Sequence, residues 1–251
     1  MLSTGSRSYS GGSVILMIAL KSPWILAFGV MTVVHLVLNG AEVEPWDSIT
    51  KCLLAPLLIA WVIEQKGPRL LVAALVFCFF GDLFLEFDDL FIIGMAAFAL
   101  GHICFIRFFI SRGAIGQLRR KPWILVVYVV AGIAMIAYGW SGLEDGLKPV
   151  VPIYAALLVG TGATSLATDI RAGIGGLLFL ISDGVILLGE ADRIDKDAVA
   201  SGLAIMALYI AAIFFLTTGI LNREKVTIAA GPGFDPTIRT DCWPVFPDTK
   251  A

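Results

Sequence analysis

The segment LLVAALVFCFFGDLFLEFDD, residues 70–89, decides the class of fold to which this chain belongs. It begins with an uninterrupted apolar run and then carries two carboxylates, Asp82 and Glu86, among further apolar side chains. A helix needs about 20 mainly apolar residues to cross the hydrocarbon core of a bilayer. The segment therefore predicts a membrane-spanning helix that carries an acid while it is still crossing hydrocarbon.

The whole chain has the composition that such a helix requires. Of its 251 residues, 58% are hydrophobic and only 15% are charged, and the mean hydropathy is +0.90. A soluble domain has about half apolar and about a quarter charged residues. The sequence therefore predicts a multi-pass protein whose main partner is the lipid bilayer. No basic patch or nucleic-acid motif appears, so nucleic acid is excluded as a partner.

Eight apolar segments are long enough to be spans, and they predict an all-α integral membrane protein of about eight transmembrane helices. A tail of residues 1–21 precedes this transmembrane domain of residues 22–221, and a polar tail of residues 222–251 follows it. The predicted spans are residues 22–39, 50–65, 69–87, 90–110, 122–140, 149–168, 173–190 and 198–221. The small-residue runs GTGATSLATD (160–169) and AGIGG (172–176) predict close packing between helices.

Motifs for metal, nucleotide or serine chemistry are missing. The four cysteines, at positions 52, 78, 104 and 242, form no Cys-x-x-Cys pair and no Cys/His cluster, so neither a disulfide framework nor a metal site is predicted. No P-loop, His-Glu-x-x-His or Gly-x-Ser-x-Gly signature occurs either. We therefore expect no cofactor. The oligomeric state has no signal in the sequence.

The distribution of charge in the connections predicts the orientation. Lys and Arg gather before the first span, after the last one and in the connections after the even-numbered spans, whereas the other connections are mainly acidic. Positively charged connections stay in the cytoplasm. With an even number of spans, both termini are predicted to be cytoplasmic, in a bacterial inner membrane or a eukaryotic internal membrane.

Two segments four spans apart resemble each other. FCFFGDLFLEF (77–87) and LFLISDGVILLGE (178–190) both place an aspartate after an aromatic-containing apolar run and a small residue. The echo is either a coincidence or the trace of two parallel four-helix halves.

Asp82 and Asp183 are the strongest candidate functional residues. An ionisable group at membrane depth costs about 2.5–3.5 kcal/mol on insertion scales, and such groups are therefore functional candidates. The alternative is a structural carboxyl paired with a neighbouring helix. Glu86 lies one helical turn beyond Asp82 on the same face, where solvation at the membrane surface is the simpler interpretation.

Three basic side chains are secondary candidates. His102, within the fourth predicted span, could relay a proton, bind a carboxylate or be a satisfied structural histidine. His35 lies nearer a helix end and is interpreted as an interfacial residue. Lys51 opens the second span, either as a lysine that snorkels to the surface or as a ligand for phosphate or a carboxylate.

Together these residues resemble the YhhN-like family over about residues 20–221. The motifs that carry the resemblance are Lys51 with Pro56, Gly81-Asp82, His102, Ser182-Asp183 and Tyr209, in this order across the spans. The chain departs from the family pattern at Cys52, where proline is usual, and at Phe105, where an aromatic hydroxyl is common.

The resemblance implies a fold of eight spans and the activity of the family's animal members, the lysoplasmalogenases, which hydrolyse the vinyl-ether bond of a lysophospholipid-type substrate. Such a reaction needs an acid that protonates the alkene and a negative group that stabilises the resulting cation, roles that a pair of carboxyls can divide. Asp82 and Asp183 are assigned to these two roles. Lys51 is expected to contact phosphate, with His102, Glu86, Ser182 and Tyr209 around the site.

Two functions from other classes use the same residues. A proton-coupled transporter or lipid translocator would also need buried carboxylates and a histidine at membrane depth. A structural or receptor-like protein would use the acids only to hold its helices together. Release of aldehyde in detergent, where no second compartment exists, would separate the enzyme from the transporter.

Overall fold

The computed structural model describes residues 22–229, and within this range every regular element is a helix. The predicted tail of residues 1–21 lies outside the described residues, as do residues 230–251. The helices are α2 (Pro23–Gly40), α3 (Trp46–Glu64), α4 (Arg69–Phe84), the 3₁₀ turn η1 (Asp88–Leu90), α5 (Phe91–Ser111), α6 (Ala114–Arg120), α7 (Pro122–Gly139), α8 (Val150–Thr168), α9 (Ile170–Glu190) and α10 (Val199–Ala229). The expected all-α fold is confirmed.

Seven helices in the described range are long and apolar enough to cross a membrane, namely α2, α3, α5, α7, α8, α9 and α10. The remaining predicted span, residues 69–87, is α4, which has only 16 residues because it ends at Phe84 rather than at residue 87. At about 1.5 Å per residue, α4 is shorter than the hydrocarbon thickness of about 30 Å. The protein is therefore a multi-pass membrane protein of about eight helices, one of which is short.

Other boundaries differ from the sequence-based expectation as well: α3 begins at Trp46 rather than at residue 50, and α9 begins at Ile170 rather than at residue 173. The short helix α6 occupies part of the fourth connection, after Gly113, whose φ of 88° suits a residue without a side chain. Helix α10 continues to Ala229 instead of ending at residue 221. Its polar last turns are held by neighbouring elements: Glu224 pairs with Arg112, and the Lys225 Nζ donates to the Gln65 Oε1 at 3.1 Å.

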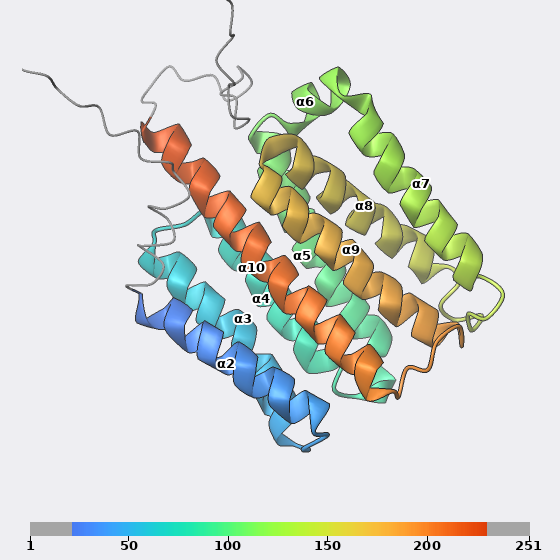
Figure 1. The fold of residues 1–251 in the computed structure, drawn as a ribbon. Helices are drawn as coiled ribbons and strands as arrows, with labels where there is room; N and C mark the ends of the chain where they lie inside the picture. Colours follow the sequence, from blue (N-terminus) through green and yellow to red (C-terminus); the bar gives the residue numbers. More distant parts are fainter. Residues whose placement is uncertain (1–21, 230–251) are drawn as a thin grey trace, which may run out of the picture.

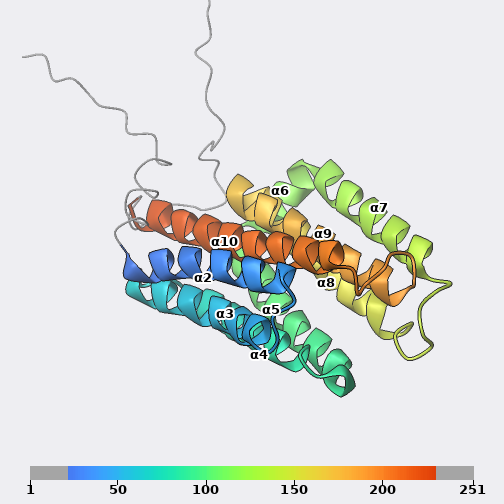
Figure 2. The same ribbon diagram turned by 60° about the horizontal axis from the view of Figure 1, so that its bottom comes forward.

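The helices run side by side in one bundle, with α2 and α7 at its opposite sides (Figure 1). A view turned by 60° shows α9 and α10 adjacent along their length, with α2 and α3 on the other flank of α10 (Figure 2). Close packing at the predicted small residues is confirmed. A Cβ built on Gly175 of α9 would lie 2.6 Å from the backbone nitrogen of Leu216 on α10.

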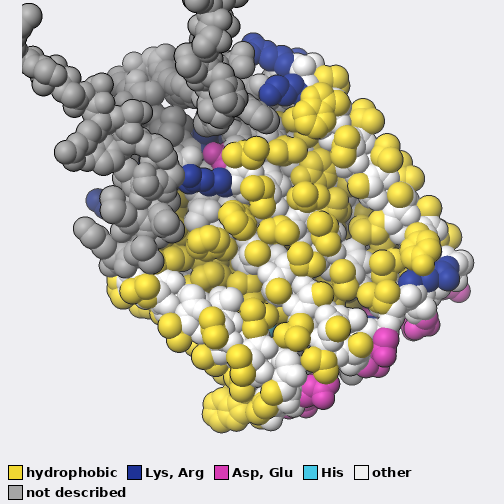
Figure 3. All heavy atoms as spheres, in the orientation of Figure 1, with side chains coloured by type: hydrophobic (Ala, Val, Ile, Leu, Met, Phe, Trp, Pro, Cys, Tyr) yellow, Lys and Arg dark blue, Asp and Glu magenta, His cyan; other side chains and the backbone are white. Residues whose placement is uncertain are grey.

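The surface of the bundle is apolar, as a lipid-facing surface must be, and its charges gather at the two ends (Figure 3). Basic side chains lie at the end where α6 caps the bundle, and most acidic side chains, together with a few basic ones, lie at the end that holds the connections after α2, α4, α7 and α9. The functional candidates lie near this acidic end.

Candidate active site

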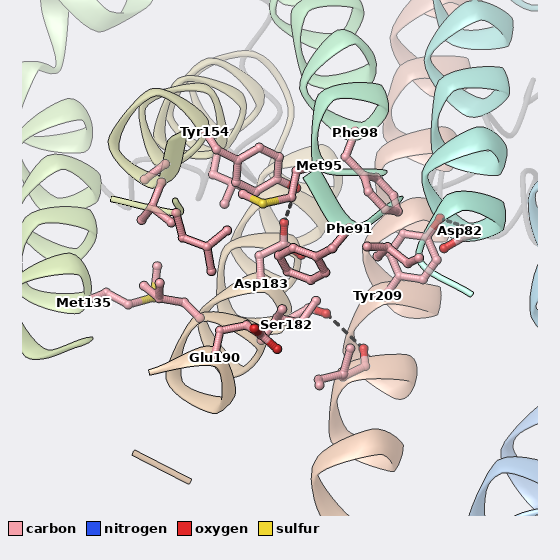
Figure 4. A pocket seen from close by; sticks show the side chains of 18 of the residues that line it. Asp82, Phe91, Met95, Phe98, Met135, Tyr154, Ser182, Asp183, Glu190 and Tyr209 are labelled. Carbon is pink, nitrogen blue, oxygen red and sulfur yellow. Dashed lines mark hydrogen bonds between the residues drawn. The ribbon is translucent and has the colours of Figure 1, made fainter. Parts of the chain in front are cut away.

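A cavity lies inside the bundle at its acidic end, where α4, α7 and α9 end and α5, α8 and α10 begin (Figure 4). Water-sized molecules could occupy about 110 Å³ of it, enough for several waters or a segment of an alkyl chain. Its walls are mostly Leu, Ile, Met and Phe side chains. The polar residues that line it are Lys51, Asp82, Tyr154, Ser182, Asp183, Glu190 and Tyr209.

Asp82 is the carboxylate on the α4 side of the cavity. Only 2% of the residue is exposed, although it lies two residues from the end of the shortened helix. The Tyr209 hydroxyl of α10 donates to its Oδ2 at 2.6 Å. Edge-on contacts with Phe98 and Phe179, at ring-centroid distances of 5.8 and 5.5 Å, hold the tyrosine ring in place. Asp82 is therefore fixed by a neighbour 127 positions away in the chain.

Asp183 is the carboxylate on the α9 side, and it also binds a tyrosine. The Tyr154 hydroxyl of α8 donates to the Asp183 Oδ2. The neighbouring Ser182 hydroxyl donates to the carbonyl oxygen of Ile205 at 3.0 Å, which ties α9 to α10 beside the cavity. The structure thus brings the two predicted aspartates to one cavity and gives each its own tyrosine partner. Figure 4 shows the two pairs on different walls.

Lys51 and Glu86 form an ion pair at one edge of the cavity. Their side chains are only 18% and 20% exposed. Simple solvation of Glu86 at the membrane surface, the sequence-based interpretation, is therefore wrong: the short α4 ends early enough for Glu86 to turn toward α3. Lys51 faces the cavity rather than snorkelling outward, and its ammonium group acts electrostatically on Asp82.

His102 is buried, at 1% exposure, and no carboxylate of residues 22–229 forms a hydrogen bond with it. Its Nδ1 lies 3.1 Å from the Thr161 Oγ1 of α8. The ring packs against Phe179 and Tyr154, at centroid distances of 4.6 and 5.8 Å. His102 thus lies behind the Asp183–Tyr154 pair and outside the cavity lining, a position that suits support of the tyrosine.

Tyr154 and Glu190 are polar residues of the cavity that the sequence analysis did not single out as candidates. Tyr154 sits early in its span, where a tyrosine is normally an interfacial residue, so its sequence position carries no signal of its hydrogen bond. Glu190 ends α9, lines the cavity and pairs with the Lys196 Nζ at 3.2 Å. Within residues 22–229 no three His, Cys, Asp or Glu side chains converge as metal ligands would.

Comparison with known proteins identifies relatives along most of the chain. The model of the YhhN family matches residues 46–220. The human protein named lysoplasmalogenase TMEM86B is 30% identical over 181 residues, which cover 70% of this chain and 75% of the human protein. A bovine protein named lysoplasmalogenase TMEM86A is 27% identical over 232 residues, or 82% of this chain and 92% of the relative.

A bacterial relative extends the match. The protein named lysoplasmalogenase from Mycobacterium bovis is 27% identical over 242 residues, which cover 85% of this chain and 89% of the relative. No solved structure matches the chain at a significant level. The family match spans more than half of the chain, from α3 to α10, and includes both aspartate–tyrosine pairs. This chain is a member of the YhhN family.

Proposed function

We propose that this protein is a membrane hydrolase that cleaves the vinyl-ether bond of a lysoplasmalogen, releasing a fatty aldehyde and a glycerophospho-alcohol. The observation that carries the proposal is the pair of carboxyls in one mostly apolar cavity, of which Asp82 is buried and Asp183 is half-buried. The names of the relatives point to the same reaction. A lysolipid reaches such a cavity by way of the bilayer, so its alkenyl chain stays among apolar side chains throughout.

The reaction needs one proton, one water and no oxidant. The acid protonates the alkene carbon remote from the ether oxygen, and this leaves an oxocarbenium ion. Water adds to the cationic carbon and loses a proton to the base. The resulting hemiacetal then collapses: its hydroxyl loses a proton, its carbon–oxygen bond to the glycerol breaks, the glycerol oxygen takes up a proton, and the aldehyde is released. The proton that started the reaction is thereby returned, and one water is consumed. A carboxyl beside a carboxylate supports a related cation in glycoside hydrolysis.

The contacts suggest how the two aspartates divide this work. A nearby cation stabilises a carboxylate, and Lys51 acts on Asp82, so Asp82 suits the negative group that faces the oxocarbenium ion. Asp183 suits the acid. Because Tyr154 donates to its Oδ2, that oxygen serves as the acceptor and the proton resides on Oδ1, available to the alkene. Tyr209 orients Asp82 in the same manner.

Substitution of each aspartate tests the proposal. Asp82→Asn and Asp183→Asn keep the side-chain size but remove the ionisable group, and each should reduce aldehyde release from purified, folded protein to background. Asp145→Asn, in an exposed connection, is the matched control and should leave the rate unchanged. A wild-type rate in either cavity variant would refute the paired-carboxyl mechanism.

Isotope labelling tests the bond that breaks. In deuterated water the aldehyde should carry one deuterium on the carbon next to the carbonyl, because the acid delivers a solvent proton there. In water labelled with oxygen-18, the glycerophospho-alcohol should stay unlabelled, since its own oxygen leaves with it. Label in the alcohol would exclude attack at the vinyl carbon.

A further inference from the structure

A second pocket adjoins the cavity and holds polar groups that the mechanism does not use. It lies between the end of α2, the start of α3 and α10, with a volume of about 190 Å³. Lys51, Ile205 and Met206 line both spaces, so the two are neighbours across these side chains. We call this space, lined by His35, Asn39, Asp47, Lys51 and Glu86 among others, the polar pocket.

His35 is the most informative residue of the polar pocket. It is 1% exposed, so the sequence-based interpretation of an interfacial histidine is wrong. Its Nδ1 lies 3.1 Å from the carbonyl oxygen of Asp47 and 3.1 Å from the Thr50 Oγ1. A carbonyl oxygen only accepts, so Nδ1 is the donor and the neutral ring keeps a lone pair on Nε2. That buried Nε2 has no hydrogen-bond partner within the described residues.

Lys51 and Ser48 bring donors to the pocket, but its remaining polar side chains offer further acceptors. The buried Oδ1 of Asn39 has no partner among the described residues. Asp47 and Glu86 contribute carboxylates from the start of α3 and the end of α4. Buried polar atoms in proteins are nearly always hydrogen-bonded, so unpaired acceptors beside carboxylates point to a ligand that brings N–H donors and positive charge.

We propose that the polar pocket binds the primary ammonium group of an ethanolamine headgroup, and that the enzyme therefore prefers ethanolamine over choline lysolipids. An ammonium group has three N–H donors, which the His35 Nε2, the Asn39 Oδ1 and the Glu86 carboxylate can accept. A trimethylammonium group has none. Proteins hold quaternary ammonium groups against aromatic faces, and no Phe, Tyr or Trp lines this pocket within the described residues.

The Lys51–Glu86 ion pair fits a ligand that carries both charges. With a phosphoethanolamine group between them, Lys51 meets the phosphate and Glu86 meets the ammonium, so neither buried charge loses its counter-ion. The alkenyl chain then lies in the apolar cavity and the vinyl ether near Asp82, beside Lys51. The orientation of the alkenyl chain in this assignment rests on the proposed function.

A binding measurement tests the headgroup preference without catalysis. The probes are two 1-O-alkyl lysophospholipids, with ethanolamine or choline headgroups, whose saturated ether cannot follow the vinyl-ether route. Purified full-length protein in detergent should bind the ethanolamine probe at least about tenfold more tightly, the size of one hydrogen bond to a charged group. Asn39→Leu should remove most of this preference by weakening the ethanolamine probe alone. Asn222→Leu replaces an equally half-buried asparagine far from the pocket and should preserve it.

The outcomes separate this inference from the proposed function. Equal affinity of the wild-type protein for the two probes, or an Asn39→Leu variant that weakens both equally, would overturn the ethanolamine site. Neither result depends on turnover. Absence of aldehyde from ethanolamine and choline lysoplasmalogens alike would instead remove the hydrolase, while a headgroup preference in binding would still support the site.

Discussion

Tyr209→Phe isolates the hydrogen bond that holds Asp82. The substitution removes only the hydroxyl that donates to the Asp82 Oδ2 at 2.6 Å, and the ring keeps its edge-on contacts with Phe98 and Phe179. A hydrogen bond to a charged group contributes about 1.5–3 kcal/mol. If the bond is needed in the transition state, kcat should fall about 10- to 100-fold, at about 1.4 kcal/mol per tenfold.

The assay is aldehyde release from a lysoplasmalogen at saturating substrate, with elution from a sizing column as the check of folding. Tyr128→Phe is the matched control, since Tyr128 is 5% exposed, packs between α7 and α8, and does not line the cavity. Its rate should equal that of the wild type.

A double-mutant cycle sharpens the prediction. In the Asp82→Asn background the tyrosine hydroxyl no longer positions a carboxylate, so adding Tyr209→Phe should cause no further loss of any residual activity. An undiminished kcat for Tyr209→Phe alone, or losses that multiply in the double variant, would refute the argument that Tyr209 acts through Asp82.

Two further predictions concern stability and orientation. Gly175→Ala should lower the melting temperature in detergent, because its Cβ would lie 2.6 Å from the Leu216 backbone nitrogen and 2.8 Å from the Ala212 backbone oxygen. The control, Gly29→Ala, places a Cβ with no neighbouring side chain or other helix within 4 Å and should leave the melting temperature unchanged. Equal melting temperatures for the two variants would contradict tight packing of α9 against α10. If both termini are cytoplasmic, a membrane-impermeant thiol reagent should label Asp145→Cys, at the acidic end, in intact cells, and Arg119→Cys, at the basic end, only after permeabilisation. The unsubstituted protein gives the background labelling of the native cysteines. The reverse pattern would place both termini outside the cytoplasm.

The sequence could single out the two aspartates that line the cavity, because ionisable groups are rare in hydrocarbon; their catalytic roles stay a prediction. It could not single out their partners. Tyr154 and Tyr209 acquire their roles from the packing of α8 against α9 and of α10 against α4, and a tyrosine in an apolar run has no distinctive pattern of its own. Tyr209 was predicted as a site residue only from the family resemblance, and Tyr154 was not predicted. The predicted parallel four-helix halves stay a prediction.

The polar pocket could not be predicted from the sequence either, because it depends on where the helices end and how the chain turns between them. The turn between α2 and α3 folds the start of α3 back onto α2, so His35 contacts Asp47 and Thr50 instead of facing the membrane surface. The end of α4 at Phe84 matters equally, since it leaves Glu86 outside the helix and lets its side chain reach Lys51 of α3. A helix continued to residue 87 would have placed Glu86 elsewhere. Both features depend on where helices stop, which hydropathy defines least well.

Asp82 and Asp183 line one cavity, but each is hydrogen-bonded to its own tyrosine and not to the other aspartate. In a medium of low dielectric constant, two adjacent carboxylates repel strongly, and a shared proton would make neither a dedicated acid. Separate tyrosine donors instead fix one oxygen of each aspartate and leave the other for the substrate. Lys51 acts electrostatically on Asp82, and among the described residues no lysine acts on Asp183 in this way, so the proposed mechanism gives Asp82 the role of the counter-ion. In the proposed mechanism, a substrate with its headgroup against Lys51 would meet the anion first and the acid farther along its chain, in the order in which the vinyl ether presents its oxygen-bearing and remote carbons.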